Sequence, residues 1–209
     1  FIVPILPGPR YLKSSLIESL PDGTPLVDKL RYLLSIDIPE DILKDEYPSV
    51  ANYLREGVAS GVAEGYLCQS RKYWYLQEKR KAPRFVVSYM GRGDGEGSPP
   101  IRFFLNRSSA LATNAFICLY PKPELQALLE EHPEREEALL SLLNAIPRTV
   151  LENAGRSYGG GLRKIEPKEL RSVPLENPPA WLTIKRTEQI DLFAGHSLFG
   201  ETRGKLKAV

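Results

Sequence analysis

The sequence predicts an α+β fold, with a small antiparallel sheet packed by helices and a glycine-rich loop leading into a short helix. Three apolar segments indicate strands, at residues 84–90, 101–105 and 115–120. Leucines at three- and four-residue spacing between residues 121 and 146 indicate a pair of amphipathic helices. The third strand candidate favours this fold over a doubly wound parallel sheet.

The chain divides into three predicted parts. Residues 1–60 form a helical lead or an inserted subdomain, with helical segments at 24–34 and 39–53. Residues 61–182 contain the strand and helix signals of the core. Residues 183–209 mix polar and apolar side chains with three glycines, which predicts a loosely attached tail.

The central strands and the helices after them have clear boundaries in the sequence. Residues 84–90 and 101–105 flank a ten-residue connection rich in glycine and proline, which predicts a hairpin with a long mobile loop. Pro133 suits the first turn of the second helix, where its missing N–H loses no hydrogen bond. An acidic helix face repels phosphate, so we expect it to point away from any nucleic acid. The acidic residues of the two predicted helices are Glu124, Glu130, Glu131, Glu134, Glu136 and Glu137.

Composition excludes several classes of protein. With 28 cations and 26 anions the net charge is +2, so only the distribution of charge can indicate a nucleic-acid partner. Cys68 and Cys118 have no paired neighbours, which indicates neither a disulfide framework nor a zinc site. No apolar run approaches the length of a membrane span, so we expect no membrane association and a cytoplasmic location.

Positive charge is concentrated in residues 71–84, where six cations accompany the single acid Glu78. The stretch begins with Arg71 and Lys72 and continues with the rings of Tyr73, Trp74 and Tyr75. Such a mixture suits a nucleic-acid surface, because cations neutralise phosphates while rings stack on bases or wedge between them. The alternative is a solvated basic turn whose aromatic rings are buried.

A second candidate site is the glycine-rich segment at residues 155–170. Its glycines accept backbone angles that other residues avoid, and they leave no side chain to hold a ligand away. The cations around them suit phosphate, and a tyrosine ring can stack or donate a hydrogen bond. The alternative is a helix start after a flexible turn, with Pro167 in the first turn. The residues of this site are Arg156, Tyr158, Gly159, Gly160, Gly161, Arg163 and Lys164.

Asn106 begins a polar segment that continues through Ser108, Thr113 and Asn114. An asparagine side chain can make a bidentate hydrogen bond with adenine. The same side chains can equally satisfy the backbone of a turn, so both interpretations stay open.

Three segments occur in a recognisable order: YLCQSRKYWY at 66–75, NRSSALATN at 106–114 and GRSYGGGLRKIEPKEL at 155–170. They resemble the target-recognition region of Eco57I-like adenine-N6 DNA methyltransferases from bacterial restriction-modification systems. The resemblance implies that residues 61–182 form the core of a DNA-binding domain. Its partners would be double-stranded DNA and a catalytic domain of the same parent chain. We expect DNA contacts from Arg71, Lys72, Trp74, Tyr75, Asn106, Arg156, Tyr158, Gly159, Gly160, Gly161, Arg163 and Lys164.

The catalytic motifs of that family have no convincing match. Its S-adenosylmethionine loop and Asn-Pro-Pro-aromatic or Asp-Pro-Pro-aromatic tetrad lie upstream of target recognition. The similar run at residues 177–180 lies downstream and has Ala180 in place of the aromatic residue. Since the chain also begins at Phe1 rather than Met, we expect a fragment that does not methylate DNA alone and holds no cofactor. S-adenosylmethionine would serve the intact parent enzyme. The recognised sequence, a fused endonuclease and the oligomeric state are not indicated.

Two other functions are compatible with parts of the sequence. The run Glu166-Pro167-Lys168 has the Glu-x-Lys spacing of metal-dependent nucleases, but its proline and its place at a helix start argue against that site. The stronger alternative is a helical protein-interaction module of a larger defence or modification complex. It would use the leucine-rich helices and would be indifferent to DNA and salt.

Overall fold

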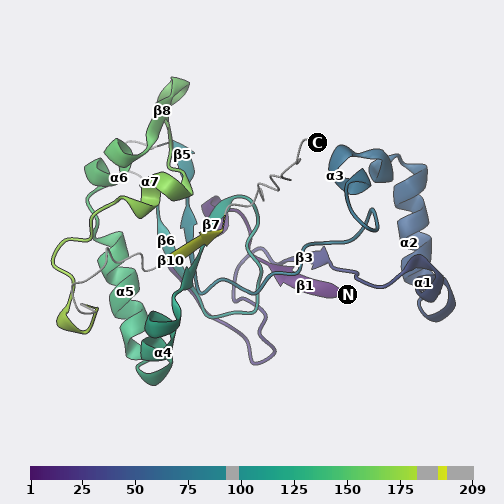
Figure 1. Ribbon diagram of the computed structural model, residues 1–209, viewed down its shortest axis with the longest axis horizontal. Helices are drawn as coiled ribbons and strands as arrows, with labels where there is room; N and C mark the ends of the chain where they lie inside the picture. The colour runs from purple at the N-terminus through teal and green to yellow at the C-terminus, as the bar shows by residue number, and fades with distance from the viewer. Residues whose placement is uncertain (93–98, 183–192, 197–209) are drawn as a thin grey trace, which may run out of the picture. The chain divides into compact units, whose positions relative to one another are not determined.

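The computed structural model describes residues 1–92, 99–182 and 193–196, the last of these as backbone only (Figure 1). The chain forms two compact units. The small unit comprises Phe1–Pro4 and Arg31–Lys81, and the large unit comprises Ile5–Leu30 and Ala82–Val209. The sequence-based division after residue 60 differs from this one, because aromatic residues between 61 and 81 pack into the core of the small unit.

The small unit joins short strands to helices. Acidic residues in the first turn suit the first helix, and Pro48 begins the second, where its missing N–H loses no hydrogen bond. The helical segment predicted at 39–53 is confirmed, with a break at Tyr47. The elements are β1 (Ile2–Ile5), β3 (Arg31–Leu34), α1 (Glu40–Glu46), α2 (Pro48–Ala59) and α3 (Tyr66–Gln69).

The prediction of a helix at residues 24–34 is wrong. Pro25 forms a β-bridge with Ser19, and β3 pairs with β1. Strand pairing satisfies the backbone groups of this segment, and Pro25 has no N–H to give to a helix. Long-range pairing therefore overrides the local apolar spacing.

The core of the small unit contains Ile36, Leu43, Ala51, Leu54 and Tyr75. The Trp74 indole packs against α2 at Gly57, where a Cβ would lie 2.6 Å from Trp74 Cη2. A side chain at position 57 would therefore displace the indole, so this close approach of α2 and the aromatic run depends on glycine.

The main sheet of the large unit has the strand order β10-β7-β4-β6-β2. Val86 of β4 lies opposite Phe104 of β6 and Cys118 of β7. Neighbouring strands are antiparallel except β2 and β6, which are parallel. This arrangement confirms the predicted α+β class and the strand candidates. The strands are β2 (Leu16–Ile17), β4 (Phe85–Ser88), β6 (Phe103–Asn106), β7 (Phe116–Pro121) and β10 (Phe193–His196).

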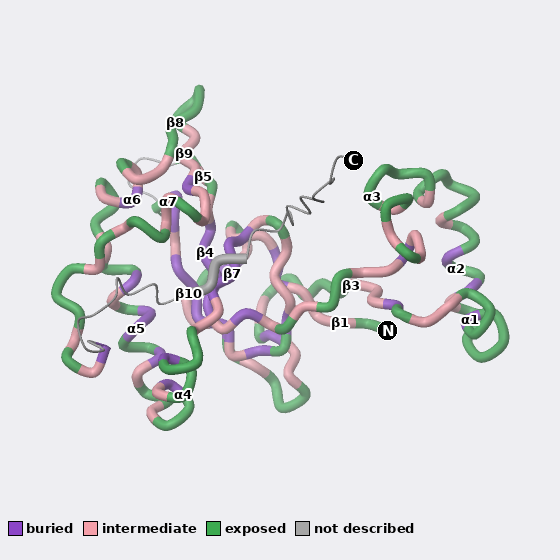
Figure 2. The backbone as a smooth tube through the Cα atoms, viewed as in Figure 1, coloured by how far each residue is buried: buried purple, intermediate pink, exposed green. Residues whose placement is uncertain are grey.

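Both faces of this sheet are covered, as the purple stretches of β4 and β7 in Figure 2 show. Because side chains alternate along a strand, Phe85 and Val87 pack with the helical leucines, whereas Val86 packs with Phe104 and Phe116. The predicted helical pair is confirmed as α4 and α5. The helices of this unit are α4 (Pro123–Glu131), α5 (Glu134–Asn144), α6 (Arg148–Ala154) and α7 (Pro167–Arg171).

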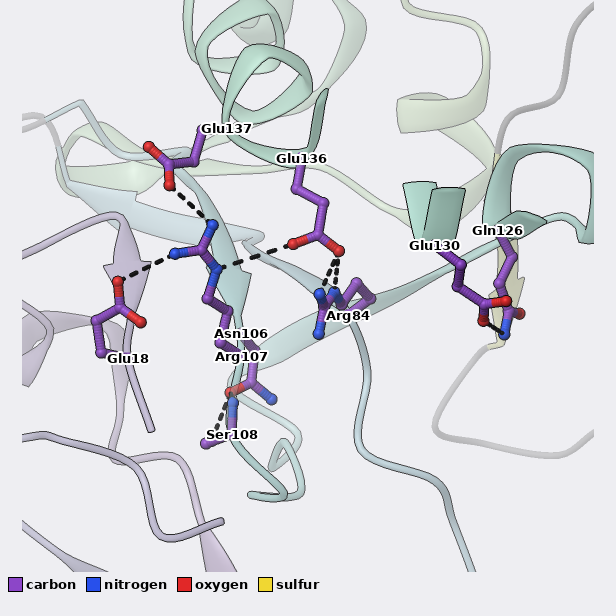
Figure 3. A network of polar contacts seen from close by, with 9 residues as sticks. All are labelled: Glu18, Arg84, Asn106, Arg107, Ser108, Gln126, Glu130, Glu136 and Glu137. Atoms are coloured by element: carbon purple, nitrogen blue, oxygen red, sulfur yellow. Dashed lines mark hydrogen bonds and ion pairs between the residues drawn. The ribbon is translucent and has the colours of Figure 1, made fainter. Parts of the chain in front are cut away.

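One acidic residue of α5 does not lie on the expected outer face. The Glu136 side chain is 4% exposed and pairs with Arg84 and Arg107 (Figure 3). Arg107 also pairs with Glu18 at 3.1 Å and with Glu137 at 2.8 Å. These contacts join four segments of the large unit, and they already compensate the charge of Arg84, the last cation of the basic stretch.

Two predictions concern residues outside the described ranges. Residues 93–98, in the loop expected to be mobile, are one case. Most of the tail expected after residue 182 is the other, although β10 within it pairs with β7 from Phe193 opposite Pro121 to His196 opposite Cys118. Among the described helices, none combines the length and apolar character needed to cross a bilayer.

Candidate nucleic-acid interface

A second sheet in the large unit presents the glycine-rich segment. Its strand order is β5-β9-β8, with β5 (Met90–Arg92), β9 (Leu162–Lys164) and β8 (Arg156–Tyr158) paired antiparallel. Residues Gly159–Gly161 form the turn between β8 and β9, so the segment is a β-hairpin (Figure 1). The glycine-rich loop therefore leads into β9, and α7 follows at Pro167.

The hairpin tip consists of three glycines, and the fold requires glycine at only two of these positions. Gly160 and Gly161 have φ angles of 71° and 73°, which favour glycine. Gly159 has no such angle, and a Cβ added there would meet no atom within 4 Å. Neither backbone strain nor packing among the described residues therefore requires glycine at position 159.

The base of the hairpin is closely packed. A Cβ on Gly155 would lie 2.5 Å from the Lys164 carbonyl oxygen, so only glycine fits there. Ile165 is fully buried. At the start of α7 the Glu169 carboxylate accepts the Glu166 N–H at 2.8 Å, as half of a capping box. The exposed tip thus stands on an ordered base.

The strand register divides the predicted cations between two faces of this sheet. Directly opposite residues share a face, as do residues two apart on a strand. Arg163 lies opposite Ser157 and donates a hydrogen bond to its hydroxyl. The other face combines charge with an aromatic ring, and we call it the hairpin face: Arg92, Arg156, Tyr158 and Lys164. The sheet therefore does not bring Arg163 together with the other two predicted cations.

Arg92 is a candidate that the sequence analysis missed. It is exposed and has no carboxylate partner among the described residues. Its Nε lies 4.0 Å from the position of a Cβ on Gly160, so the guanidinium reaches the hairpin tip. Arg92 joins the site only through the pairing of β5 with β9, for which the sequence contains no local signal.

The other two cations of the hairpin face have carboxylate partners. Arg156 pairs with Glu169 at 2.7 Å, and Lys164 pairs with Glu166 at 2.6 Å. The hydrogen bond from the Glu166 N–H lowers the pKa of the Glu169 carboxyl, and Arg156 lowers it further. Both pairs are only partly exposed, with side-chain exposures of 62% and 19% for Arg156 and Glu169 and of 29% and 37% for Lys164 and Glu166. The glutamates position the cations in the free protein, and a phosphate bound there would compete with them.

Comparison with known proteins identifies the family. The family model of the Type II methyltransferase M.Eco57I, C-terminal domain, matches residues 26–197. The chain belongs to this family. The resemblance to Eco57I-like methyltransferases is thereby confirmed.

Two curated relatives of this M.Eco57I C-terminal domain are also Type II methyltransferases. M.XamI of Xanthomonas campestris pv. amaranthicola is 30% identical over 148 residues, which cover 68% of this chain and 25% of that protein. M.AccI of Acinetobacter calcoaceticus is 24% identical over 122 residues, which cover 58% of this chain and 21% of that protein. The matched part thus spans a quarter or less of the length of these relatives. No solved structure matches the chain.

In this M.Eco57I-type domain the aromatic residues of the basic stretch lie in the small unit, and Tyr75 is not available to DNA. It is 6% exposed, and its hydroxyl donates to the Ile38 carbonyl at 2.9 Å. Trp74 is half-buried against Gly57. The prediction of a base contact by Tyr75 is therefore corrected. The segment forms a turn rather than a strand.

Arg71 and Lys72 follow α3 and have no acidic partner among the described residues. The Lys72 ammonium lies 5.0 Å from the centroid of the Tyr73 ring. Two later cations of the stretch are already compensated, in the pairs Lys79–Asp37 and Arg80–Glu78. DNA contacts by Arg71 and Lys72 stay predictions.

Asn106 is committed to the protein. Its side chain is buried, and its amide nitrogen donates to the carbonyls of Pro83 and Ala110, both at 3.1 Å. Its amide oxygen accepts the Ser108 hydroxyl at 2.6 Å. The geometry matches the interpretation in which this side chain satisfies a turn, and it leaves no group for a base.

Among the described residues, neither the run at 177–180 nor the glycine turn fits a methyl-transfer site. Asn177 has a φ of 47°, and Ala180 begins a short 3-10 turn where the family tetrad requires an aromatic ring. The glycine turn is the tip of a β-hairpin, whereas a nucleotide-type loop connects a strand to a helix. No step of methyl transfer is therefore assigned to these side chains.

Proposed function

We propose that this chain is the target-recognition part of an adenine-N6 DNA methyltransferase of a restriction-modification system. The observation that carries the proposal is the bare tip at Gly159, beside three cations and a tyrosine on one face of an ordered hairpin. A backbone without side chains can approach a phosphate closely, and arginine and lysine neutralise it. Membership of the M.Eco57I C-terminal domain family supports the same function.

In the proposed role this chain holds the duplex and the rest of the parent enzyme does the chemistry. Arg92, Arg156 and Lys164 bind phosphates and set the register, while the exposed ring of Tyr158 contacts a sugar or a base. A separate catalytic domain binds S-adenosylmethionine and receives the extruded adenine in the bacterial cytoplasm. Contacts to the DNA backbone on this side help to offset the cost of unstacking, about a few kcal/mol.

Substitution of Gly159 by Ala separates binding from folding. Since a Cβ at this position has open space and the backbone angle is ordinary, we expect a change in unfolding free energy below about 0.5 kcal/mol. If DNA lies against the tip, the methyl group displaces it and weakens duplex binding by about tenfold, the loss of one good hydrogen bond. Urea unfolding and fluorescence anisotropy measure the two effects. Unchanged duplex affinity contradicts a close approach of DNA at Gly159.

The recognition function itself is tested by selection from a random duplex library. The 209-residue chain is incubated with the library, and bound duplexes are amplified and sequenced over several rounds. Enrichment of a short sequence supports target recognition. If duplexes are retained without enrichment of any sequence, the chain binds DNA non-specifically, and that outcome contradicts the proposal.

A protein-interaction role is supported by exposed side chains of the small unit, and not by the leucine-rich helices from which it was expected. The leucines of α4 and α5 that were expected to dock a partner are mostly buried in the core of the large unit. In the small unit several large apolar side chains are more than half exposed instead, which is typical of an interaction surface. They are Tyr53, Val58, Val62, Tyr66 and Leu67. A Tyr66→Asp/Leu67→Asp variant that loses binding to a partner protein and retains duplex affinity supports this second function.

A further inference from the structure

The N-terminal part of the large unit contains a second cluster of cations around an aromatic ring. The Arg10 guanidinium carbon and the Lys29 ammonium each lie 4.7 Å from the centroid of the Tyr11 ring. Both cations are exposed, and neither has a carboxylate partner among the described residues. We propose that Arg10 and Lys29 bind a phosphate of the DNA backbone, as a contact site additional to the hairpin face. This inference rests on the proposed function.

The backbone that carries Arg10 and Tyr11 is tied to the main sheet. The Arg102 guanidinium, next to β6, donates to the Pro9 carbonyl at 2.8 Å and to the Leu12 carbonyl at 3.3 Å. Arg102 also lies over the Phe104 ring, with 4.9 Å between the guanidinium carbon and the ring centroid. The Arg102 guanidinium thus holds both ends of the turn through these two hydrogen bonds. The turn therefore presents Arg10 and Tyr11 from a fixed position.

The charges of the cluster favour an anion. The Tyr11 ring attracts both cations through its negative face, but the two positive charges repel each other. A carboxylate does not relieve this repulsion at either residue within the described chain, in contrast to Lys13 nearby, which is paired with Asp28. A bound phosphate would relieve it. Arg10 and Lys29 are therefore the two cations of this region whose charge is available to a ligand.

The surface beside the ring accommodates more than an isolated phosphate ion. A shallow hollow of about 110 Å³ adjoins Tyr11 between the segments that carry Arg10 and Lys29, and its lining combines apolar side chains with Ser14 and the Lys13–Asp28 ion pair. A phosphate held by the cations would place its attached sugar toward this hollow. The combination of charge, ring and apolar lining fits a phosphodiester better than inorganic phosphate. The apolar lining is formed by Leu12, Leu16, Ile17, Leu26 and Val27.

The test compares the salt dependence of duplex binding between variants of the 209-residue chain. Removal of both cations in Arg10→Ala/Lys29→Ala should flatten the log–log slope by about 0.9 units, the value for the one phosphate that they bind together. The swap Arg10→Lys/Lys29→Arg keeps both charges and should keep the wild-type slope. As a charge-matched control, Lys44→Ala/Arg55→Ala removes two cations from the helices of the small unit and should change the slope by less than about 0.5 units.

The outcomes separate this inference from the proposed function. If wild type binds duplex DNA with a strong salt dependence and Arg10→Ala/Lys29→Ala gives the same slope, the second contact site is refuted while the hairpin face stands. If the control flattens the slope as much as Arg10→Ala/Lys29→Ala, the effect is one of general charge and the site is equally refuted. If wild type does not bind duplex DNA, the proposed function fails first. Inorganic phosphate and an unlabelled duplex are also compared as competitors of the labelled duplex at constant ionic strength. If inorganic phosphate competes as strongly as the unlabelled duplex, the cluster is a site for free phosphate instead.

Discussion

Replacing Arg92, Arg156 and Lys164 together by alanine should flatten the salt dependence of duplex binding by about 2.7 units of log–log slope. The expected value follows from about 0.9 units for each phosphate that a cation neutralises. The register places all three cations on one face of the β5-β9-β8 sheet, around Tyr158. The loss should be similar for unrelated duplex sequences, because phosphate contacts set affinity and register but do not read bases. Fluorescence anisotropy over a series of salt concentrations measures the slope.

Arg163 supplies the control in the same hairpin. It lies opposite Ser157 on the other face, and its guanidinium is 3.9 Å from the Glu152 carboxylate. Arg163→Ala should therefore change the slope by less than about 0.5 units, well under one phosphate contact. A further variant with Arg92→Lys, Arg156→Lys and Lys164→Arg keeps the charges and should keep the slope. If Arg163→Ala has the larger effect, the DNA lies on the opposite face and the assignment of the hairpin face is wrong.

Glu136→Ala should destabilise the large unit by about 2–3 kcal/mol. Breaking a buried ion pair by removing one partner costs about 3–5 kcal/mol, because the remaining charge loses its compensation. The expected loss is smaller here, since the side chains of Arg84 and Arg107 are 41% and 28% exposed and water can partly solvate them. Urea unfolding in a Trp74→Phe background reports on the large unit through Trp181, which packs against its core.

Two companion variants show whether the effect comes from the charge of Glu136. Glu136→Gln keeps the shape and the hydrogen-bonding oxygen but removes the charge. Its free energy of unfolding should therefore lie between those of wild type and Glu136→Ala. Glu131→Ala removes an exposed carboxylate at the end of α4 and should change stability by less than about 0.5 kcal/mol. Equal stabilities of Glu136→Ala and Glu131→Ala would show that the buried network contributes nothing to folding.

Local sequence signals predict the elements of the large unit well. The apolar segments that become β4, β6 and β7 are short and bounded by turn residues, and the leucine spacing of α4 and α5 fits the helical period. Pro167 occupies the first turn of α7, as its fixed φ angle favours. These features depend on neighbours along the chain, so they can be read without knowing the fold.

The site was predicted less completely, because its composition depends on pairing between distant segments. Arg92 and Arg163 lie on opposite faces only through the register of β5, β9 and β8, which no local pattern fixes. Asn106 is buried because Pro83 and Ala110 supply acceptors for its amide. The charge of Glu136 is inward because Arg84 and Arg107 meet it there. In each case the fold brings the side chain its partner, and that partner decides on which face or at which depth the side chain lies.

The most direct test of DNA binding by this chain is the affinity of the 209-residue chain for a labelled duplex and for a matched single strand between about 50 and 200 mM salt. We expect tighter binding to the duplex, with a log–log slope of about −3.6 if each of the three hairpin cations neutralises one phosphate and the two cations around Tyr11 together neutralise a fourth. Absence of duplex binding at the lowest salt concentration, or a slope near zero, would contradict the account.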